Sequence, residues 1–318
     1  MSSIRQAFVL GAGLGTRLRP LTETLPKPLI PTWNRPLITF AFDHLIRELG
    51  VERFLVNTHH CPEAYGGAFA SGVYKQHSIE LRHEPVLLDT AGGIDNVRDW
   101  LPEDETFVVY NGDILTDLPL EAAIEAHERA GNIATLILRS DGDELRVGFD
   151  QSSGRVVDLR GQLRPDWSER YQFTGIYLLS PAFLKFIRKG KIESVVLSFL
   201  SAIRAGERVG GVVIDTGVWT DLGEREAYLD SLTLRNQGFP AYRTENRLRR
   251  VADSADIDET AKVDSLSVIG PGVRVGKGAK VSQSVLWSGA VIEEGTVLDR
   301  VIVREEKVVS GSHVGVDI

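Results

Sequence analysis

The first two-thirds of the chain alternate short apolar runs with longer stretches of helical periodicity. Four short, mostly apolar runs predict strands, at residues 7–10, 53–56, 107–110 and 133–138, and the last of them, rich in branched residues, is typical of a buried strand. Two stretches, residues 37–49 and 120–130, repeat apolar side chains at helical spacing, and a glycine follows each of them. Strands that alternate with helices predict an α/β fold, in which a mostly parallel sheet carries helices on both faces.

The last part of the chain follows a six-residue period instead. Branched apolar residues occupy this period in two frames separated by a slip, first at Ile257, Val263, Ile269, Val275 and Val281 and then at Val285, Val291, Val297, Val303 and Val309. One branched residue per short strand, stacked coil upon coil, is typical of a left-handed parallel β-helix, here of only a few turns.

A polar, irregular stretch with a basic run at residues 246–250 separates the two patterns. Charged runs of this kind are usually solvated, so we interpret the stretch as a linker. We therefore predict three regions, namely an α/β domain at residues 1–235, a linker at 236–256 and a β-helix domain at 257–318.

The first predicted strand ends in a glycine-rich turn, residues 11–15, and cations follow it closely. Arg17 and Arg19 come directly after the turn, and Lys27 stands between two prolines. A glycine-rich turn exposes backbone N–H groups that bind anions, while guanidinium and ammonium groups pair with phosphate oxygens. The glycine spacing fits neither the dinucleotide fingerprint nor the P-loop. The segment therefore predicts a phosphate-binding loop of another kind.

This segment resembles the signature of sugar-1-phosphate nucleotidyltransferases, G-x-G-T-R-L-x-P-L-T followed after a short gap by P-K-P. Gly11 stands where that family often has alanine, a minor departure. The resemblance implies a Rossmann-like catalytic domain in which Arg17 and Lys27 are catalytic. It also implies that the turn and its flanks bind the nucleotide, through Leu10, Gly11, Ala12, Gly13, Gly15 and Thr16, with the amides of residues 11–16 on the β- and γ-phosphates.

Two aspartates resemble the metal ligands of that family. Asp113 ends the strand in Tyr110-Asn111-Gly112-Asp113, although Asn-Gly and Gly-Asp pairs also mark ordinary turns. Asp221 lies in Trp219-Thr220-Asp221-Leu222-Gly223, which resembles the W-x-D-[IVL]-G motif, whereas the nearby Asp215 lacks the tryptophan. Mg²⁺ prefers carboxylate and phosphate oxygens, so the resemblance implies one Mg²⁺ ion held by Asp113 and Asp221.

Residues 84–94 look like the family segment E-x-x-x-L-G-T-A-G-A, which passes the nucleotide base. The resemblance implies base contacts from Glu84, Thr90, Ala91 and Gly92. Asp89 replaces a glycine of that pattern and Gly93 an alanine. A helix start with Asp89 or Thr90 as N-cap explains the small residues equally well. Some uridylyltransferases of the family carry an acid at the position of Asp89, so the segment leaves the base open.

The segments that resemble the sugar side of the family are less complete. They are Val147-Gly148-Phe149 and Phe173-Thr174-Gly175-Ile176-Tyr177, and the usual E-K-P motif is missing. Arg160 stands where that lysine is expected, and an exposed hairpin arginine is the other reading. The residues that we predict to bind the sugar phosphate are Asn111, Gly148, Arg160, Thr174 and Gly175. His59 and His60 could be mistaken for a pair of metal ligands, but adjacent residues at a strand end point apart. We interpret them as loop residues.

The resemblance implies transfer of a nucleoside monophosphate from a triphosphate to a sugar-1-phosphate, with release of pyrophosphate. The β-helix makes the chain look most like mannose-1-phosphate guanylyltransferases, and uridylyl or thymidylyl transfer remains the alternative. Hexapeptide acyltransferases share the repeat but need a longer helix and an interfacial histidine, and only His313 is available. A catalytically silent sensor of nucleotide sugars is a further alternative, against which Arg17, Lys27 and both aspartates argue.

Composition adds limits to this picture. The net charge of −8 argues against a general nucleic-acid binder. The single cysteine, Cys61, excludes an internal disulfide and a multi-cysteine metal site. Neither a signal peptide nor a transmembrane span is recognisable. We therefore expect a cytoplasmic enzyme with small-molecule substrates and no membrane partner, and the β-helix, with its open ends, predicts a homo-oligomer.

Overall fold

The computed structural model describes residues 4–235, 239 and 250–318. The chain divides into two compact units, of which the first comprises Met1–Leu14 and Ile38–Trp219. The second comprises Gly15–Leu37 and Thr220–Ile318, so the segment with Arg17 and Lys27 belongs to the same unit as the C-terminal region. Most of the predicted linker lies outside the described residues, and the predicted domain boundaries stay a prediction.

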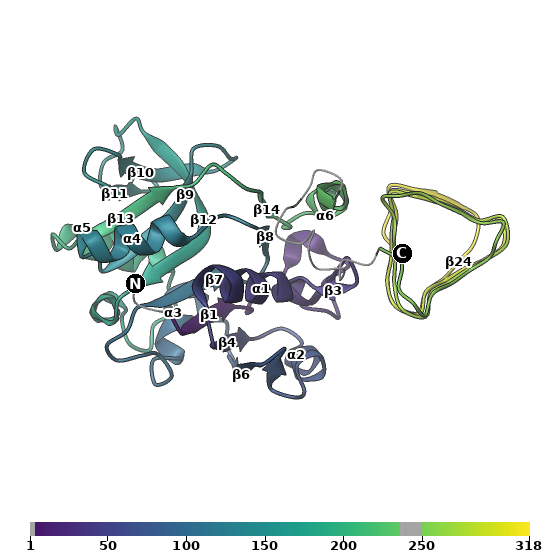
Figure 1. The fold of residues 1–318 in the computed structure, drawn as a ribbon, viewed down its shortest axis with the longest axis horizontal. Helices are drawn as coiled ribbons and strands as arrows, with labels where there is room; N and C mark the ends of the chain where they lie inside the picture. The colour runs from purple at the N-terminus through teal and green to yellow at the C-terminus, as the bar shows by residue number, and fades with distance from the viewer. Residues whose placement is uncertain (1–3, 236–238, 240–249) are drawn as a thin grey trace. The chain divides into compact units, whose positions relative to one another are not determined.

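A mixed sheet of ten strands forms the centre of the first unit (Figure 1), in the order β10-β11-β13-β9-β12-β7-β1-β4-β6-β5. The strands are β1 (Gln6–Leu10), β4 (Arg53–Thr58), β5 (Val73–Tyr74), β6 (His77–His83), β7 (Phe107–Asn111), β9 (Ala134–Arg139), β10 (Leu145–Asp150), β11 (Arg155–Leu159), β12 (Arg170–Leu179) and β13 (Val209–Val213). The short strand β8 (Ile114–Thr116) follows β7.

The sheet is parallel where the phosphate loop leaves it. β1 pairs in parallel with β4 on one side and with β7 on the other, and β4 pairs in parallel with β6. β9 and β13 are also parallel, whereas β12 runs antiparallel between β9 and β7. The α/β fold is confirmed. The loop that follows β1 and the turn that follows β7 leave the same edge of the sheet, because parallel neighbours end together.

Helices cover both faces of this sheet, as the sequence predicts. They are α1 (Ile38–Leu49), α2 (Pro62–Ala68), α3 (Asp89–Asn96), α4 (Glu121–Ala130), the 3₁₀ helix η3 (Pro181–Phe186) and α5 (Val195–Arg204). Phe8 and Leu55 join α3 and α5 in one buried cluster. The opposite face meets α1 through the ring contact of Phe42 with Phe54, at a centroid distance of 4.7 Å. Strand residues alternate between the faces, so adjacent positions face different helices.

The predicted helix ends are confirmed where a glycine follows the apolar stretch. Gly131 caps α4 with φ 62°, and its amide donates to the carbonyl of Glu128. Gly50 follows α1 with φ 69° and donates to the carbonyl of Ile46. Left-handed backbone at these positions favours glycine, which satisfies the last carbonyls of the helix.

The second unit begins with a run of short elements. They are the 3₁₀ helices η1 (Thr16–Leu18) and η2 (Lys27–Leu29) and the hairpin strands β2 (Pro31–Thr32) and β3 (Arg35–Pro36). Strand β14 (Trp219–Asp221) spans the boundary between the units, and α6 (Arg225–Asp230) and η4 (Ser231–Arg235) follow it.

The C-terminal part of the second unit is the predicted left-handed parallel β-helix, whose coils form the triangle at the right of Figure 1. Its strands are β15 (Asp256–Ile257), β16 (Lys262–Val263), β17 (Val268–Ile269), β18 (Arg274–Val275), β19 (Lys280–Ser282), β20 (Val285–Leu286), β21 (Val291–Ile292), β22 (Val297–Asp299), β23 (Ile302–Val303), β24 (Val308–Val309) and β25 (Ser312–Val314). All pairs between them are parallel, and every third strand shares a face.

The frame predicted after the slip is wrong at three positions. Leu286, Ile292 and Leu298 stack on Ile269, Val275 and Val281, and they enter the buried cluster in place of Val285, Val291 and Val297. The predicted single slip of two residues is replaced by two slips of one residue, between Val281 and Leu286 and between Leu298 and Val303. Each slip contains a residue with left-handed backbone, Gln283 at φ 45° and Arg300 at φ 52°. Val303 and Val309 face inward as predicted.

One buried histidine ties α1 to the strand that precedes Asp113. His44 Nε2 lies 2.8 Å from the carbonyl oxygen of Leu118, which can only accept, so this nitrogen carries the proton. Nδ1 then accepts from the hydroxyl of Tyr110 at 2.9 Å. Burial lowers the pKa of His44 to about 4, because the charged ring would lose its hydration. Among the described residues, no helix is long and apolar enough to cross a membrane.

This buried ring predicts a loss of stability on acidification. The pKa of His44 is about 6.5 in the unfolded chain and about 4 in the fold. The neutral ring therefore contributes stability that is present above pH 6.5 and is lost as the pH falls towards 4. His44→Gln keeps a donor and an acceptor without titrating. Between pH 7 and pH 5, the free energy of unfolding, measured with urea, should fall by about 1–2 kcal/mol more in the wild type than in this variant.

The partly exposed His313 provides the control for that experiment. His313→Gln removes a histidine that is only half-buried, with Nε2 2.8 Å from the carbonyl oxygen of Ser310. This variant should keep the pH dependence of the wild type. If the unfolding free energies of the wild type and His44→Gln depended equally on pH, the predicted contribution of His44 would be contradicted.

Candidate active site

The residues after the glycine turn fold back on themselves within the second unit. Gly15 has φ 58°, and its carbonyl accepts from the amide of Leu18 and from the hydroxyl of Thr22 at 2.7 Å. A Cβ atom at Gly15 would lie 3.0 Å from the Thr22 side chain, so the tight turn needs glycine. The turn starts η1, which carries Arg17 with 63% of its side chain exposed.

Lys27 and Asp221, 194 residues apart in sequence, form an ion pair. Lys27 Nζ lies 2.6 Å from Asp221 Oδ1, and 8% of the lysine side chain is exposed against 38% of the aspartate. Arg17 Nη2 lies 3.5 Å from Asp221 Oδ2. The structure therefore brings together three of the predicted site residues, and two cations neutralise one carboxylate. Breaking such a pair is costly, because a buried charge is left without a partner.

The glycine of the predicted W-x-D-L-G motif makes room for the arginine. A Cβ atom at Gly223 would lie 2.8 Å from Arg17 Nη2 and 3.0 Å from its Cζ. The guanidinium therefore lies directly over the backbone of residue 223, with Glu224 Oε1 3.7 Å from Nη1. The spacing of aspartate and glycine in this motif thus has a steric reason.

The start of the phosphate loop, in the first unit, is held by a side chain without a predicted role. Asn57 Oδ1, at the end of β4, accepts from the amide of Gly11 at 2.8 Å and from that of Ala12 at 3.2 Å. We predicted that the amides of residues 11–16 bind phosphates. Those of Gly11 and Ala12 have a protein acceptor instead, so the prediction has to rest on the residues that follow.

The fold requires glycine at position 11, although we predicted only a minor departure from the family signature there. A Cβ atom there would lie 2.7 Å from the carbonyl oxygen of Asn57 and 2.9 Å from the hydroxyl of Tyr65. That hydroxyl donates to the carbonyl of Gly11 at 2.8 Å. Burial raises the pKa of Tyr65 and the charge of Asp113 adds to the effect, so the hydroxyl keeps its proton for this bond.

Glu84 continues the network from Asn57 to the predicted base segment. Asn57 Nδ2 donates to Glu84 Oε1 at 2.8 Å, and Glu84 Oε2 accepts from the amide of Leu88 at 3.1 Å. Glu84 is completely buried. A Cβ atom at Gly93 would lie 3.1 Å from both Asn57 Nδ2 and Glu84 Oε1, which explains glycine where the family pattern has alanine. Glu84 positions its segment, and its contact with a nucleotide stays a prediction.

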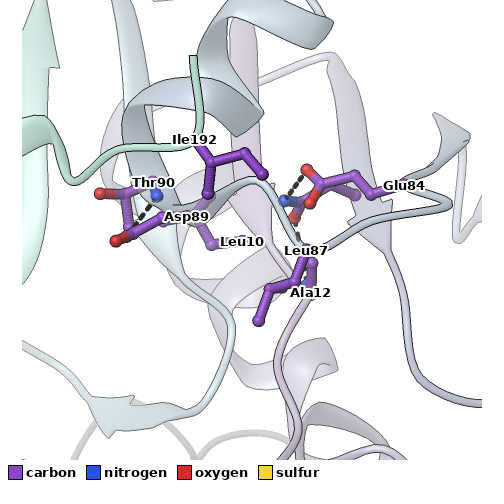
Figure 2. Close-up of a pocket in the computed structure, with 8 residues that line it drawn as sticks. Leu10, Ala12, Glu84, Leu87, Asp89, Thr90 and Ile192 are labelled. Carbon is purple, nitrogen blue, oxygen red and sulfur yellow. Dashed lines mark hydrogen bonds between the residues drawn. The ribbon is translucent and has the colours of Figure 1, made fainter.

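A pocket of about 340 Å³ opens beside this network, a size typical of small-molecule sites. Its lining consists of Leu10, Ala12, Asn57, Glu84, Leu87, Asp89, Thr90 and Ile192. Figure 2 shows Glu84 on one side of it, Asp89 and Thr90 on the other, and Leu87 between them. Four predicted nucleotide-binding residues therefore line one pocket: Leu10, Ala12, Glu84 and Thr90.

The small residues of the base segment pack against protein. The amides of Ala91 and Gly92 donate to the carbonyl of Glu193, and a Cβ atom at Gly92 would lie 2.6 Å from the carbonyl oxygen of Lys191. The predicted N-caps are wrong, because α3 begins at Asp89 and its N-cap position is Leu88, whose side chain makes no capping hydrogen bond. Asp89 has φ 59°, left-handed backbone at the position where the family pattern has glycine.

Asp113 lies in the turn between β7 and β8. Gly112, which precedes it, donates to the carbonyl of Leu10 at 2.9 Å, and a Cβ atom there would lie 2.8 Å from that oxygen. This close approach holds the turn against the end of β1. Asp215 accepts from the amide and the hydroxyl of Ser140 at 2.8 and 2.7 Å, so its carboxylate anchors another loop.

The residues predicted to bind the sugar phosphate do not all make contacts with one another. A Cβ atom at Gly175 would lie 2.5 Å from Asn111 Nδ2, so these two lie together. Thr174 is buried, and its hydroxyl donates to the carbonyl of Ile137 at 2.8 Å. Gly148 pairs with Asp158 across β10 and β11.

Arg160 follows β11 with φ 58° at an exposed turn. The turn is shaped by the buried Asp158, whose carboxylate accepts from the amides of Gly161 and Leu163 and pairs with Arg170. Contact of Arg160, Gly148, Thr174 or Gly175 with a sugar phosphate stays a prediction. His59 and His60 lie in a loop as predicted.

The carboxylates suit a hard cation. Mg²⁺ takes one or two protein carboxylates and completes its shell with phosphate oxygens and water. Asp221 is partly exposed and presents two oxygens that already attract cations, and Asp113 is half-buried in its turn. In the described part of the chain, no group of three or more His, Cys, Asp and Glu side chains is arranged to hold a metal. That Asp113 and Asp221 share one Mg²⁺ ion stays a prediction.

Sequence reasoning missed Asn57 and Tyr65, because neither belongs to the motif that it positions. The only signal was indirect: an asparagine at the end of a strand beside the glycine loop, on the edge of the sheet where ligands bind.

Comparison with known families decides which class these features belong to. A family model described as Nucleotidyl transferase matches residues 6–237. The chain belongs to the nucleotidyl transferase family. A second model, described as GlmU-like, C-terminal hexapeptide, matches residues 251–318, which contain the β-helix of this nucleotidyl transferase.

Curated relatives cover different shares of the chain. It is 30% identical to mannose-1-phosphate guanylyltransferase of Mycobacterium tuberculosis over 273 residues, which are 84% of this chain and 75% of the relative. It is 32% identical to UTP--glucose-1-phosphate uridylyltransferase of Synechocystis over 203 residues, 58% of this chain and about half (52%) of the relative. Among solved structures, the inositol-1-phosphate CTP transferase of T. maritima has a TM-score of 0.60 at 19% identity and covers 76% of this chain and 98% of its own.

The Asn57 network predicts a specific stability loss. Asn57→Ala leaves the buried Glu84 carboxylate and the loop amides without this partner. The free energy of unfolding, measured with urea, should therefore fall by about 2–4 kcal/mol. Asn96→Ala is the matched control, because among the described residues the Nδ2 of Asn96 is buried without a hydrogen-bond partner. The control should lose less than about 1 kcal/mol. Equal losses of unfolding free energy in the two variants would show that the Asn57 network does not contribute to stability.

Proposed function

We propose that this nucleotidyl transferase transfers a nucleoside monophosphate from a nucleoside triphosphate to a sugar-1-phosphate and releases pyrophosphate. The observation that carries the proposal is the cluster of Arg17, Lys27 and Asp221 on the matched family domain. An oxygen of the sugar phosphate attacks the α-phosphorus, the P–O bond to the β-phosphate breaks, and the electron pair leaves with pyrophosphate. Such transfer depends on positioning and charge neutralisation, and it needs no nucleophilic side chain.

The cations of the second unit have separable roles in this proposal. Lys27 is a buried point charge with a fixed partner, and it suits the α-phosphate, where negative charge rises during attack. Arg17 is exposed and forked, and it suits the oxygens of the leaving pyrophosphate. Asp221 holds both cations in place before the substrate arrives. Bound at Asp113 and Asp221, Mg²⁺ would neutralise phosphate charge as a Lewis acid.

We propose GTP and mannose-1-phosphate as the preferred pair. The support is that the guanylyltransferase relative aligns over 84% of this chain, a span too long to be covered by the residues before the β-helix alone. The Synechocystis relative favours UTP and glucose-1-phosphate as the second candidate, although it aligns over 58% of this chain. Asp89, a carboxylate at the pocket, can accept from the N–H groups of either guanine or uracil.

A pyrophosphate-release screen tests the reaction and the substrates together. GTP, UTP, dTTP, CTP and ATP are crossed with mannose-1-phosphate, glucose-1-phosphate and N-acetylglucosamine-1-phosphate, and kcat/KM is compared. We expect GTP with mannose-1-phosphate to give the highest value. Highest activity with another pair would correct the substrates, and no release from any pair would favour a silent sensor.

Lys27 gives a prediction about turnover. Lys27→Met keeps the buried stem but removes the charge, so kcat should fall by about two to three orders of magnitude while the far-UV spectrum is unchanged. Lys189→Met, at the surface, is the matched control and should retain wild-type kcat. Near-normal turnover of Lys27→Met would remove Lys27 from the proposed chemistry.

A further inference from the structure

The second unit joins the phosphate-binding cations to the β-helix through several direct contacts. α6 begins four residues after Asp221, and its side chains contact β-helix residues. Arg225 Nε donates to Asp317 Oδ1 at 2.7 Å, and its Nη2 donates to the carbonyls of Val316, at 3.3 Å, and Arg300. Arg300 in turn pairs with Glu226 and with Asp230 of α6. The segment that follows Asp221 is thereby fixed to two successive coils.

The segment that carries Lys27 is attached to the same β-helix on both sides of the lysine. Before it, Arg304 Nη1 lies 3.6 Å from Glu23 Oε2. After it, Asn34 Nδ2 donates to the carbonyl of Ile269 at 3.0 Å. These contacts come from different coils of the β-helix, so they restrain both the position and the direction of residues 23–34.

One buried tyrosine connects all three parts. The hydroxyl of Tyr228, on α6, donates to the carbonyl of Pro31, four residues after Lys27, and accepts from Trp287 Nε1 of the β-helix at 3.3 Å. Tyr228 is completely buried and 2% of Trp287 is exposed. Burial raises the pKa of Tyr228 far above neutrality, so the hydroxyl remains protonated and able to donate.

We propose that the β-helix is part of the catalytic apparatus, because it holds Lys27 and Asp221 at a fixed distance from each other. Tyr228 is the central positioning residue. Each partner of the ion pair lies on a short irregular segment that has little regular structure of its own. Such segments keep a fixed geometry only when their surroundings restrain them. The β-helix supplies that restraint, so its role exceeds the oligomerisation or regulation expected from its sequence. The catalytic reading of this role rests on the proposed function.

The test removes the tyrosine hydroxyl alone. Tyr228→Phe breaks both hydrogen bonds and keeps the ring, and Tyr177→Phe is the matched control, because the hydroxyl of Tyr177 is buried without a partner among the described residues. We expect kcat of Tyr228→Phe to fall about ten- to hundredfold, with KM for both substrates within about twofold and the far-UV spectrum unchanged. The control should retain wild-type kcat.

A double-mutant cycle separates positioning from general support of the fold. If Tyr228 acts through the ion pair, Tyr228→Phe should lower the residual turnover of Lys27→Met by less than about twofold, since the positioned group is already absent. A full tenfold or greater loss in both backgrounds would overturn the proposal. An unchanged kcat in Tyr228→Phe alone would overturn it as well.

Hydrogen exchange keeps the proposal testable if the proposed function fails. Peptides that cover residues 16–37 and 219–226 should exchange faster in Tyr228→Phe than in the wild type or in Tyr177→Phe, whether or not pyrophosphate is released. Wild-type protein that releases no pyrophosphate contradicts the proposed function alone. Unchanged exchange in both regions contradicts the positioning by the β-helix alone.

Discussion

The ion pair between Lys27 and Asp221 is the interaction on which the proposed chemistry depends. It joins residues 194 positions apart and leaves the lysine side chain 8% exposed, so replacing Asp221 would leave a poorly solvated ammonium group without this partner. Arg17 adds a second cation on the other carboxylate oxygen. In the proposed reaction, the positive charges are therefore compensated and oriented before phosphate oxygens compete for them. This is electrostatic preorganisation, in which little rearrangement accompanies the reaction.

A second network shapes the pocket beside Glu84, and it depends on an uncharged side chain. Asn57 has both an acceptor and a donor, so it can bind two loop amides and a buried carboxylate at once. An aspartate or a leucine of similar size could do only part of this. The buried Glu84 then fixes the amide of Leu88, directly before Asp89 at the pocket. The loop after β1 and the segment before α3 are thereby coupled through two side chains.

The sequence was sufficient to predict the α/β fold, the β-helix and the family, because these follow from periodicity and from a dense motif. Asp221 was found because its tryptophan and glycine mark it, and Gly223 proves to make room for Arg17. Asn57, Tyr65 and Tyr228 could not be predicted, since each acts through a backbone carbonyl or amide distant in sequence. The frame error in the β-helix has a similar origin. Two neighbouring branched residues fit the repeat equally well, and the left-handed turn at Gln283 decides between them.

Gly11 also restricts how this loop can be exchanged with those of relatives. Alanine is frequent at this place in the family, but here its methyl carbon would lie 2.7 Å from a β4 carbonyl oxygen and 2.9 Å from the Tyr65 hydroxyl. A loop grafted from an alanine-containing relative therefore cannot be fitted by changing residues 11–15 alone. The aromatic residue on α2 and the backbone of β4 have to change with it, so that these three pieces must be engineered as a single block.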